Sequence, residues 1–380
     1  MIYVLSFLMD VTVVYLMLGL NFRGVDAGAS PTELGILTGS FCLSYSFLCF
    51  VLARWLSSVD VRLSSIVTSI LLFILCLLST LASSVALFIV LALLIGTASA
   101  FFWPPLEHRL GQGKSHAQLY RALSLFNLWW CSGYAAATAT CGQLYYWDFR
   151  LPFLVAAACL VLIVAGSCFL APAAAGQGEA ASRENASSQT AFPIHAKRFF
   201  LTASRIFILL TYASAGCLFA LFPKLGEVLH LGKPLVSRLL FCLYLGQLVS
   251  FYLLSKSRAW QESLFFLISG QFLMAAAFLA VFLFNDEVVF ASAFAAVGLV
   301  SGLAYFSSLF YTLHEPVFQS SLAGVHEAFL SAGRLVGPVF FGVVASLLDL
   351  KAPYLFLACI FGLFAFATIW QGRPDKAGKP

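Results

Sequence analysis

Twelve apolar stretches, each close to 20 residues long, constrain this chain more than any other feature of its sequence. A helix needs about 20 apolar residues to cross the hydrocarbon core of a bilayer. Because the runs are unbroken rather than strictly alternating, they exclude a β-barrel. The predicted spans are residues 2–20, 34–56, 63–83, 86–106, 119–143, 151–171, 204–223, 235–255, 262–284, 288–313, 324–348 and 353–371. We therefore expect an all-α, multi-pass membrane protein.

The composition excludes a soluble globule and several classes of function. Apolar residues make up 61% of the chain, charged residues only 10%, and the mean hydropathy is +0.96. An average soluble domain is about one quarter charged. The basic residues are scattered through short loops, without the stripe that a nucleic-acid-binding protein needs. The 10 cysteines all lie in apolar stretches and form no CxxC, which favours packing over metal binding or disulfides.

The distribution of basic residues predicts the orientation. With the N-terminus in the cytoplasm, inward loops hold fourteen of the 21 lysines and arginines, outward loops hold six, and Arg334 lies within a span. Since cytoplasmic loops carry the excess of positive charge, both termini are expected inside the cell. We expect the protein in the cell (inner or plasma) membrane.

One polar segment divides the chain. Residues 172–203 are rich in Ala, Ser, Gly, Gln and Glu, which is typical of a flexible linker. The halves echo each other, since Gly133 and Gly142 in the fifth span correspond to Gly333 and Gly342 in the eleventh. We predict an N-terminal six-helix bundle over 1–171, a cytoplasmic linker over 172–203, and a C-terminal bundle with a short tail over 204–380. Repeated halves of this kind are typical of secondary transporters.

Three segments resemble motifs of a known family. They are Gly333-Arg-Leu-Val-Gly337-Pro338-Val-Phe-Phe-Gly342, the end of span 4 at Trp103-Pro104-Pro105-Leu106-Glu107, and the start of span 2 at Glu33-Leu34-Gly35-Ile36-Leu37. The first is similar to the GxxxGPxxGG pattern of the major facilitator superfamily, and the whole chain resembles that family. The resemblance implies two six-helix bundles related by a pseudo-two-fold axis, with a central cavity lined by spans 1, 2, 4, 5, 7, 8, 10 and 11.

The loop after the second span departs from that family. Where the family carries GxLxDRxGRR, this chain has Ala53-Arg-Trp-Leu-Ser57-Ser-Val-Asp60-Val-Arg62. Ser57 replaces the acidic residue and Asp60 the second glycine, while Arg62 is kept. The motif is implied to latch the cytoplasmic side of the two halves, so the latch here is expected to differ or to be looser.

Charges predicted inside spans are the first candidates for function. They are Asp10, Glu327 and Arg334, joined by His326 near the start of span 11. A charge in the bilayer costs at least ~2.5–3.5 kcal/mol, so each one needs a reason. One interpretation is a proton-coupling carboxylate, Glu327 or Asp10, with Arg334 either binding an anionic solute group or setting the pKa of the carboxylate. The alternative is structural, with interhelical ion pairs and an interfacial histidine.

Two further groups of residues complete the candidate site. The side chains best placed to touch a solute are polar or amphipathic: Tyr45, Trp103, Asn127, Trp130, Gln247, Tyr305 and Tyr311. The small residues favour close helix packing, and the proline favours a kink: Gly133, Gly142, Gly333, Gly337, Pro338 and Gly342.

The sequence contains no GxSxG, P-loop, HExxH or metal-ligand cluster, so we expect neither an enzyme nor a bound metal or cofactor. We predict a secondary active transporter of a small organic solute that works by alternating access with proton coupling. Its expected partners are a small-molecule substrate, protons and the lipid bilayer, without nucleic acid, and it is expected to be a monomer. The alternatives are a non-transporting sensor or assembly partner, and a membrane-embedded enzyme or lipid scramblase.

Overall fold

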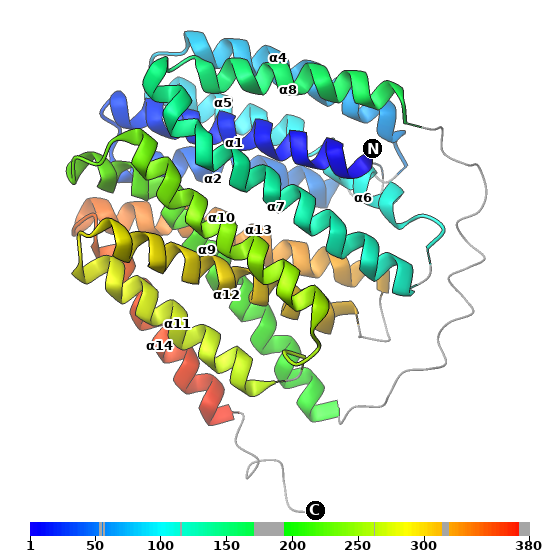
Figure 1. Ribbon diagram of the computed structural model, residues 1–380, viewed down its shortest axis with the longest axis vertical. Helices are drawn as coiled ribbons and strands as arrows, with labels where there is room; N and C mark the ends of the chain where they lie inside the picture. The colour runs from blue at the N-terminus through cyan, green and yellow to red at the C-terminus, as the bar shows by residue number, and fades with distance from the viewer. Residues whose placement is uncertain are drawn as a thin grey trace, which may run out of the picture. The chain divides into compact units, whose positions relative to one another are not determined.

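The computed structural model describes residues 1–52, 55, 58–114, 116–170, 194–261, 263–313 and 319–371. Each regular element within these ranges is a helix (Figure 1). The helices before residue 171 are α1 (Ile2–Asp26), α2 (Pro31–Val51), α4 (Val61–Leu81), α5 (Val85–Ser99), α6 (Trp103–Gly111), α7 (His116–Trp147) and α8 (Leu151–Cys168). Those after residue 193 are α9 (Ile194–Val228), α10 (Lys233–Lys256), α11 (Leu264–Leu283), α12 (Glu287–Leu313), α13 (Gln319–Leu347) and α14 (Ala352–Gln371).

Twelve helical segments correspond to the twelve predicted spans. Eleven stretches among the described residues are long and apolar enough to cross a membrane, and one of them, Val85–Gly111, joins α5 and α6. The fifth predicted span falls on α7, which is 32 residues long but carries more polar side chains. The all-α fold with twelve membrane-length segments is therefore confirmed.

Several helices begin where the sequence supplies a cap. The Asp60 carboxylate accepts a hydrogen bond from the Leu63 backbone N–H at 2.9 Å and starts α4. Asp286 accepts from the N–H groups of Val288 and Val289 at 2.9 and 3.0 Å and starts α12. Asp60, which replaces a family glycine, therefore acts locally as a helix cap.

Packing divides the chain into two units. The first comprises Met1–Leu20 and Ser40–Ala191, and the second comprises Asn21–Gly39 and Phe192–Pro380. Within the first unit α4 lies along α8 (Figure 1). Within the second, α9 packs on α13, α10 on α12, and α11 on α14. This division differs from the predicted one because the end of α1 and the start of α2 group with the C-terminal helices.

Most of the predicted linker lies outside the described residues. Its last part does not, because α9 already begins at Ile194. Residues 194–203, which the composition assigned to the linker, therefore belong to a helix. For this reason α9 begins before the apolar run of the seventh predicted span, residues 204–223.

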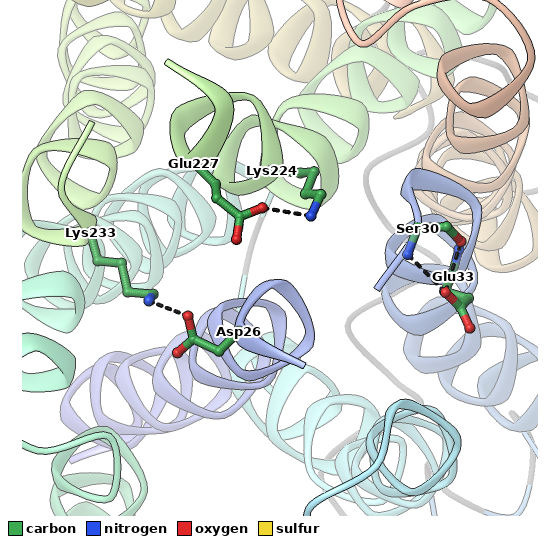
Figure 2. Close-up of polar contacts among 6 residues, drawn as sticks. All are labelled: Asp26, Ser30, Glu33, Lys224, Glu227 and Lys233. Carbon is green, nitrogen blue, oxygen red and sulfur yellow. Dashed lines mark hydrogen bonds and ion pairs between the residues drawn. The ribbon is translucent and has the colours of Figure 1, made fainter. Parts of the chain in front are cut away.

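Within the second unit, the end of α1 contacts α10, and the start of α2 contacts α13. We call this region the hairpin end and define it as residues 26–35, Lys233 and residues 338–346. Asp26 forms an ion pair with Lys233 (Figure 2). The backbone N–H of Thr32 donates to the Ser346 hydroxyl at 3.0 Å. A methyl group at Gly35 would overlap the Pro338 carbonyl oxygen, so α2 and α13 lie in backbone contact.

A capping box starts α2 at the hairpin end. The Ser30 N–H donates to Glu33 Oε2 at 2.8 Å, and the Glu33 N–H donates to the Ser30 hydroxyl at 3.3 Å (Figure 2). Two backbone donors at the start of the helix are thereby satisfied. Glu33, one of the residues that carry the family resemblance, thus has a local role in helix initiation.

Candidate functional site

The two charges that the sequence placed in span 11 lie on one face of α13. Glu327 and Arg334 are seven residues apart, about two helical turns. The Arg334 guanidinium carbon lies 5.0 Å from the ring centroid of Tyr212 on α9, within the range of a cation–π contact. The Arg334 charge also acts on the Glu327 carboxylate, whose side chain is 47% exposed. Arg334 is thus directed toward the Tyr212 ring of α9.

His326 is buried beside these charges and is tied to a neighbouring helix. Its Nδ1 lies 3.0 Å from the hydroxyl of Ser308 on α12. The Tyr305 ring packs edge to face against the imidazole, with centroids 4.9 Å apart. On its other side, Nε2 lies 3.9 Å from Glu327 Oε1, an ion pair only when the imidazole is protonated. An imidazole beside a carboxylate is suited to proton exchange.

A second buried contact joins α9 to α10. Gln247 Nε2 donates a hydrogen bond of 2.9 Å to the Tyr212 hydroxyl, and both residues are 2% exposed. The rings of Tyr212 and Tyr305 lie 6.4 Å apart, which brings α12 into the same cluster. We call the set formed by Tyr212, Gln247, Tyr305, Ser308, His326, Glu327 and Arg334 the α13 cluster.

Sequence reasoning missed Tyr212 and Ser308. Ser308 lies three residues after the predicted Tyr305, a spacing that places both on one helical face, so the periodicity could have found it. Tyr212 is the one tyrosine in the sequence of α9. A single phenol in an apolar run can also lie at the membrane interface, so its position alone did not mark it.

Glycines on α13 explain how Arg334 comes to lie above Tyr212. A methyl group at Gly333 would overlap the Leu209 carbonyl oxygen, and one at Gly337 would overlap the Ala213 carbonyl oxygen. The backbones of α9 and α13 are therefore in contact on both sides of this pair. Because Arg334 follows Gly333 and Tyr212 precedes Ala213, the guanidinium and the ring belong to residues adjacent to these backbone contacts.

Other predicted packing residues lie at similar contacts. Pro338 lies inside α13, and its ring carbons approach within 2.9 Å of the position that a methyl at Gly216 would take. A methyl at Gly342 would lie 2.7 Å from the Pro31 carbonyl oxygen at the hairpin end. Gly142 is buried in α7.

The first unit has its own polar group around Asp10, which is 4% exposed on α1. A methyl group at Gly133 of α7 would lie 2.5 Å from the Phe7 carbonyl oxygen and 3.2 Å from Asp10 Cβ. Further along α7, Trp130 Nε1 donates to Asn127 Oδ1 at 2.9 Å. Asp10, Asn127 and Trp130 are thus buried polar residues of α1 and α7.

The remaining predicted residues contact aromatic neighbours or lie at a surface. Tyr45 stacks on Phe41 with centroids 6.1 Å apart, and Trp103 packs edge-on against Phe102 and Phe126. Tyr311, near the end of α12, stacks on Phe200 at 5.4 Å. Arg62 is exposed in the first turn of α4. Of the predicted solute-contacting residues, Gln247 and Tyr305 are the ones that the structure brings into the α13 cluster.

The ligand chemistry of the described part of the chain is that of organic groups. In these ranges no three His, Cys, Asp or Glu side chains gather closely enough to hold a metal ion. The α13 cluster instead combines a cation, a carboxylate, an imidazole, phenol rings and an amide. Such groups recognise charge, planar rings and hydrogen-bonding atoms.

Comparisons with known proteins agree with this architecture. The family model described as Major Facilitator Superfamily matches residues 1–321. A mutant of the nucleoside transporter NupG superposes with a TM-score of 0.70 at 14% identity, covering 98% of this chain and 99% of that chain. A bacterial homolog to the human lysosomal transporter Spinster, inward-facing and unoccupied, gives 0.66 at 15% identity and covers 97% of each chain. At these identities the likeness concerns the fold. A search of curated proteins finds no match.

Proposed function

The chain belongs to the Major Facilitator Superfamily, and we propose that it carries a small organic solute across the membrane by alternating access, coupled to protons. The family and the membrane-length helices make it a multi-pass membrane protein of a transporter family. The solute class and the coupling ion are the proposed part. They rest on the α13 cluster.

The observation that carries the proposal is the placement of two opposite charges on one face of α13, with Arg334 over the Tyr212 ring. A charge within a span is costly unless it is used or paired, and even the mildest scale gives at least ~2.5–3.5 kcal/mol. Glu327 and Arg334 keep partial exposure, while Tyr212, Gln247 and His326 are buried. We assign solute and proton contact to the exposed pair and a supporting role to the buried residues.

The chemistry of the cluster favours a solute with a planar ring and an anionic group. Arg334 offers a planar guanidinium that binds a carboxylate or phosphate through two parallel bonds. Tyr305 is partly exposed beside it and offers a ring face. Because NupG is described as a nucleoside transporter, nucleosides and their anionic derivatives belong in the first uptake panel, with sugars and aromatic acids.

We further propose that both termini face the cytoplasm and that the protein works as a monomer, with one six-helix bundle before and one after the linker. The support is the excess of basic residues in the loops assigned to the inside. A single cysteine placed at residue 185, in a background without the 10 native cysteines, tests the orientation. Its labelling by an impermeant reagent from outside the cell would contradict it.

The coupling role is tested with Glu327→Gln in proteoliposomes. If Glu327 binds the coupled proton, the neutral amide should abolish accumulation driven by a pH gradient and leave counterflow exchange of the same solute intact. Glu287→Gln, at an exposed glutamate in the first turn of α12, is the matched control and should behave as wild type. Full coupling in Glu327→Gln would place the proton elsewhere, with Asp10 the next candidate.

The solute-binding role is tested with Arg334→Lys, measured in the same vesicles. A lysine keeps the charge but loses the planar two-point contact, so the KM for an anionic solute should rise about tenfold or more. A neutral solute should be affected less. If Arg334→Lys and Glu327→Gln both behaved as wild type in gradient-driven accumulation and in counterflow exchange, the two charges would have a structural role. The assignment of solute and proton contact to them would then be wrong.

A further inference from the structure

The helices around the α13 cluster form two closely packed pairs. In the first pair, Gly333 and Gly337 hold α13 against the backbone of α9. In the second, a methyl at Gly298 would overlap the Leu243 carbonyl oxygen, so α12 and α10 are likewise in backbone contact. Neither pair can slide or separate without losing this fit, because a glycine contact offers no flexible side chain to adjust.

Side-chain hydrogen bonds join one pair to the other. Gln247 of α10 donates to Tyr212 of α9, and Ser308 of α12 bonds to His326 of α13. The ring of Tyr305 lies between these bonds and contacts both Tyr212 and His326. The two pairs are thus connected through neutral polar groups and rings.

Tyr212 has a distinct position in this arrangement because its two ends contact different pairs. Its ring face lies under Arg334 of α13, and its hydroxyl accepts from Gln247 of α10. The ring is buried in an apolar cluster with Ile208 and Leu330, which restrains its rotation. The direction of the Arg334 guanidinium therefore depends on a ring that is held from both sides.

We propose that Tyr212 is a positioning residue of the transport site, whose ring orients Arg334 toward the anionic group of the solute and whose hydroxyl ties that arrangement to α10. The proposal rests on the proposed transport function and names the residue that organises it. An unrestrained arginine samples many rotamers, whereas a guanidinium over a buried ring keeps few. Through the hydrogen bond between its hydroxyl and Gln247, a movement of α10 would shift the ring and with it the Arg334 guanidinium.

The dicarbonyl reagent phenylglyoxal tests the arrangement, because it condenses with accessible guanidinium groups and the modified arginines are located by peptide mass spectrometry. In Tyr212→Leu the ring is lost, so Arg334 should react about tenfold faster than in wild type. Tyr212→Phe keeps the ring and should restore the slow rate. Arg238 on α10 is exposed and should react at one rate in all variants, which controls for folding and reagent.

The outcomes separate this proposal from the proposed function. An equal Arg334 rate in wild type, Tyr212→Phe and Tyr212→Leu, with unchanged Arg238, would overturn the positioning role even if transport were demonstrated. A fast rate in Tyr212→Phe as well would assign the effect to the hydroxyl and overturn the role of the ring. Conversely, the expected pattern would stand even if every solute of the uptake panel failed.

Discussion

Two regions of the second unit, the α13 cluster and the hairpin end, use polar groups in different ways. In the α13 cluster, His326 and its partner Ser308 are buried, and the contact between them is a hydrogen bond between an imidazole and a hydroxyl group. At the hairpin end, Asp26 and Lys233 form an ion pair, and their side chains are 45% and 29% exposed. Burial, more than formal charge, decides how much such contacts contribute to the free energy of unfolding. A buried group left unpaired costs about 1–3 kcal/mol, whereas an exposed ion pair contributes about 0–1 kcal/mol.

The two regions meet at Pro338. Its ring faces Gly216 of α9, and its carbonyl oxygen faces Gly35 of α2. A proline inside a helix cannot donate to the carbonyl four residues earlier, which here belongs to Arg334. The backbone is therefore weakened between the charged residues and the hairpin end.

The largest effect is expected from Gly337→Leu, because a side chain there would overlap the Ala213 backbone and separate α9 from α13. We expect a loss of at least about 3 kcal/mol in unfolding free energy, enough to remove most folded protein. Fluorescence-detected size exclusion of detergent extracts measures it. Gly362→Leu on α14 is the control, since a Cβ added there would meet no atom within 4 Å beyond its chain neighbours and the nearby backbone of its own helix. Equal profiles for the two variants would show that the α13 contact tolerates adjustment.

An intermediate effect is expected from Ser308→Ala, which leaves the buried His326 Nδ1 without its partner across two helices. The expected loss is about 1–3 kcal/mol, seen as a lower thermal midpoint of the purified protein. Ser255→Ala removes a hydroxyl that donates to the carbonyl of Tyr252 on its own helix, and it should change the midpoint little. If the thermal midpoint of Ser308→Ala were unchanged, water would have to reach the buried polar groups of the α13 cluster as readily as it reaches those of the hairpin end.

The features that could be predicted from the sequence are those that a single residue or a single continuous segment reveals by its own chemistry. Apolar runs set the twelve spans, and the cost of burying charge singled out Glu327 and Arg334. Neutral polar residues carry no such signal. Tyr212 acquires its significance from partners more than 30 residues away, Gln247 and Arg334, and that pairing depends on helix packing that glycine spacing alone does not determine.

The hairpin end was hidden for a related reason. Glu33 belongs to a segment that resembles a family motif, but its contacts form a capping box with Ser30. The grouping of residues 21–39 with the C-terminal helices depends on the contact of Gly35 with Pro338, which are far apart in the chain. A linker identified by composition marks where the chain is polar. It does not determine which helix ends pack together.

The smallest effect is expected from Asp26→Asn, which neutralises one side of the exposed ion pair with Lys233. Water and salt screen such a pair, so the unfolding free energy should fall by less than about 1 kcal/mol, and the difference should shrink further at high ionic strength. Thermal midpoints of wild type, Asp26→Asn, Lys233→Met and the double variant isolate the interaction. The pair Lys224–Glu227, 2.5 Å apart within α9, is the matched reference, because it cannot join two helices (Figure 2). If breaking Asp26–Lys233 cost more than Ser308→Ala and kept its effect in high salt, the hairpin end would be as well shielded as the α13 cluster, and burial would no longer distinguish the two regions.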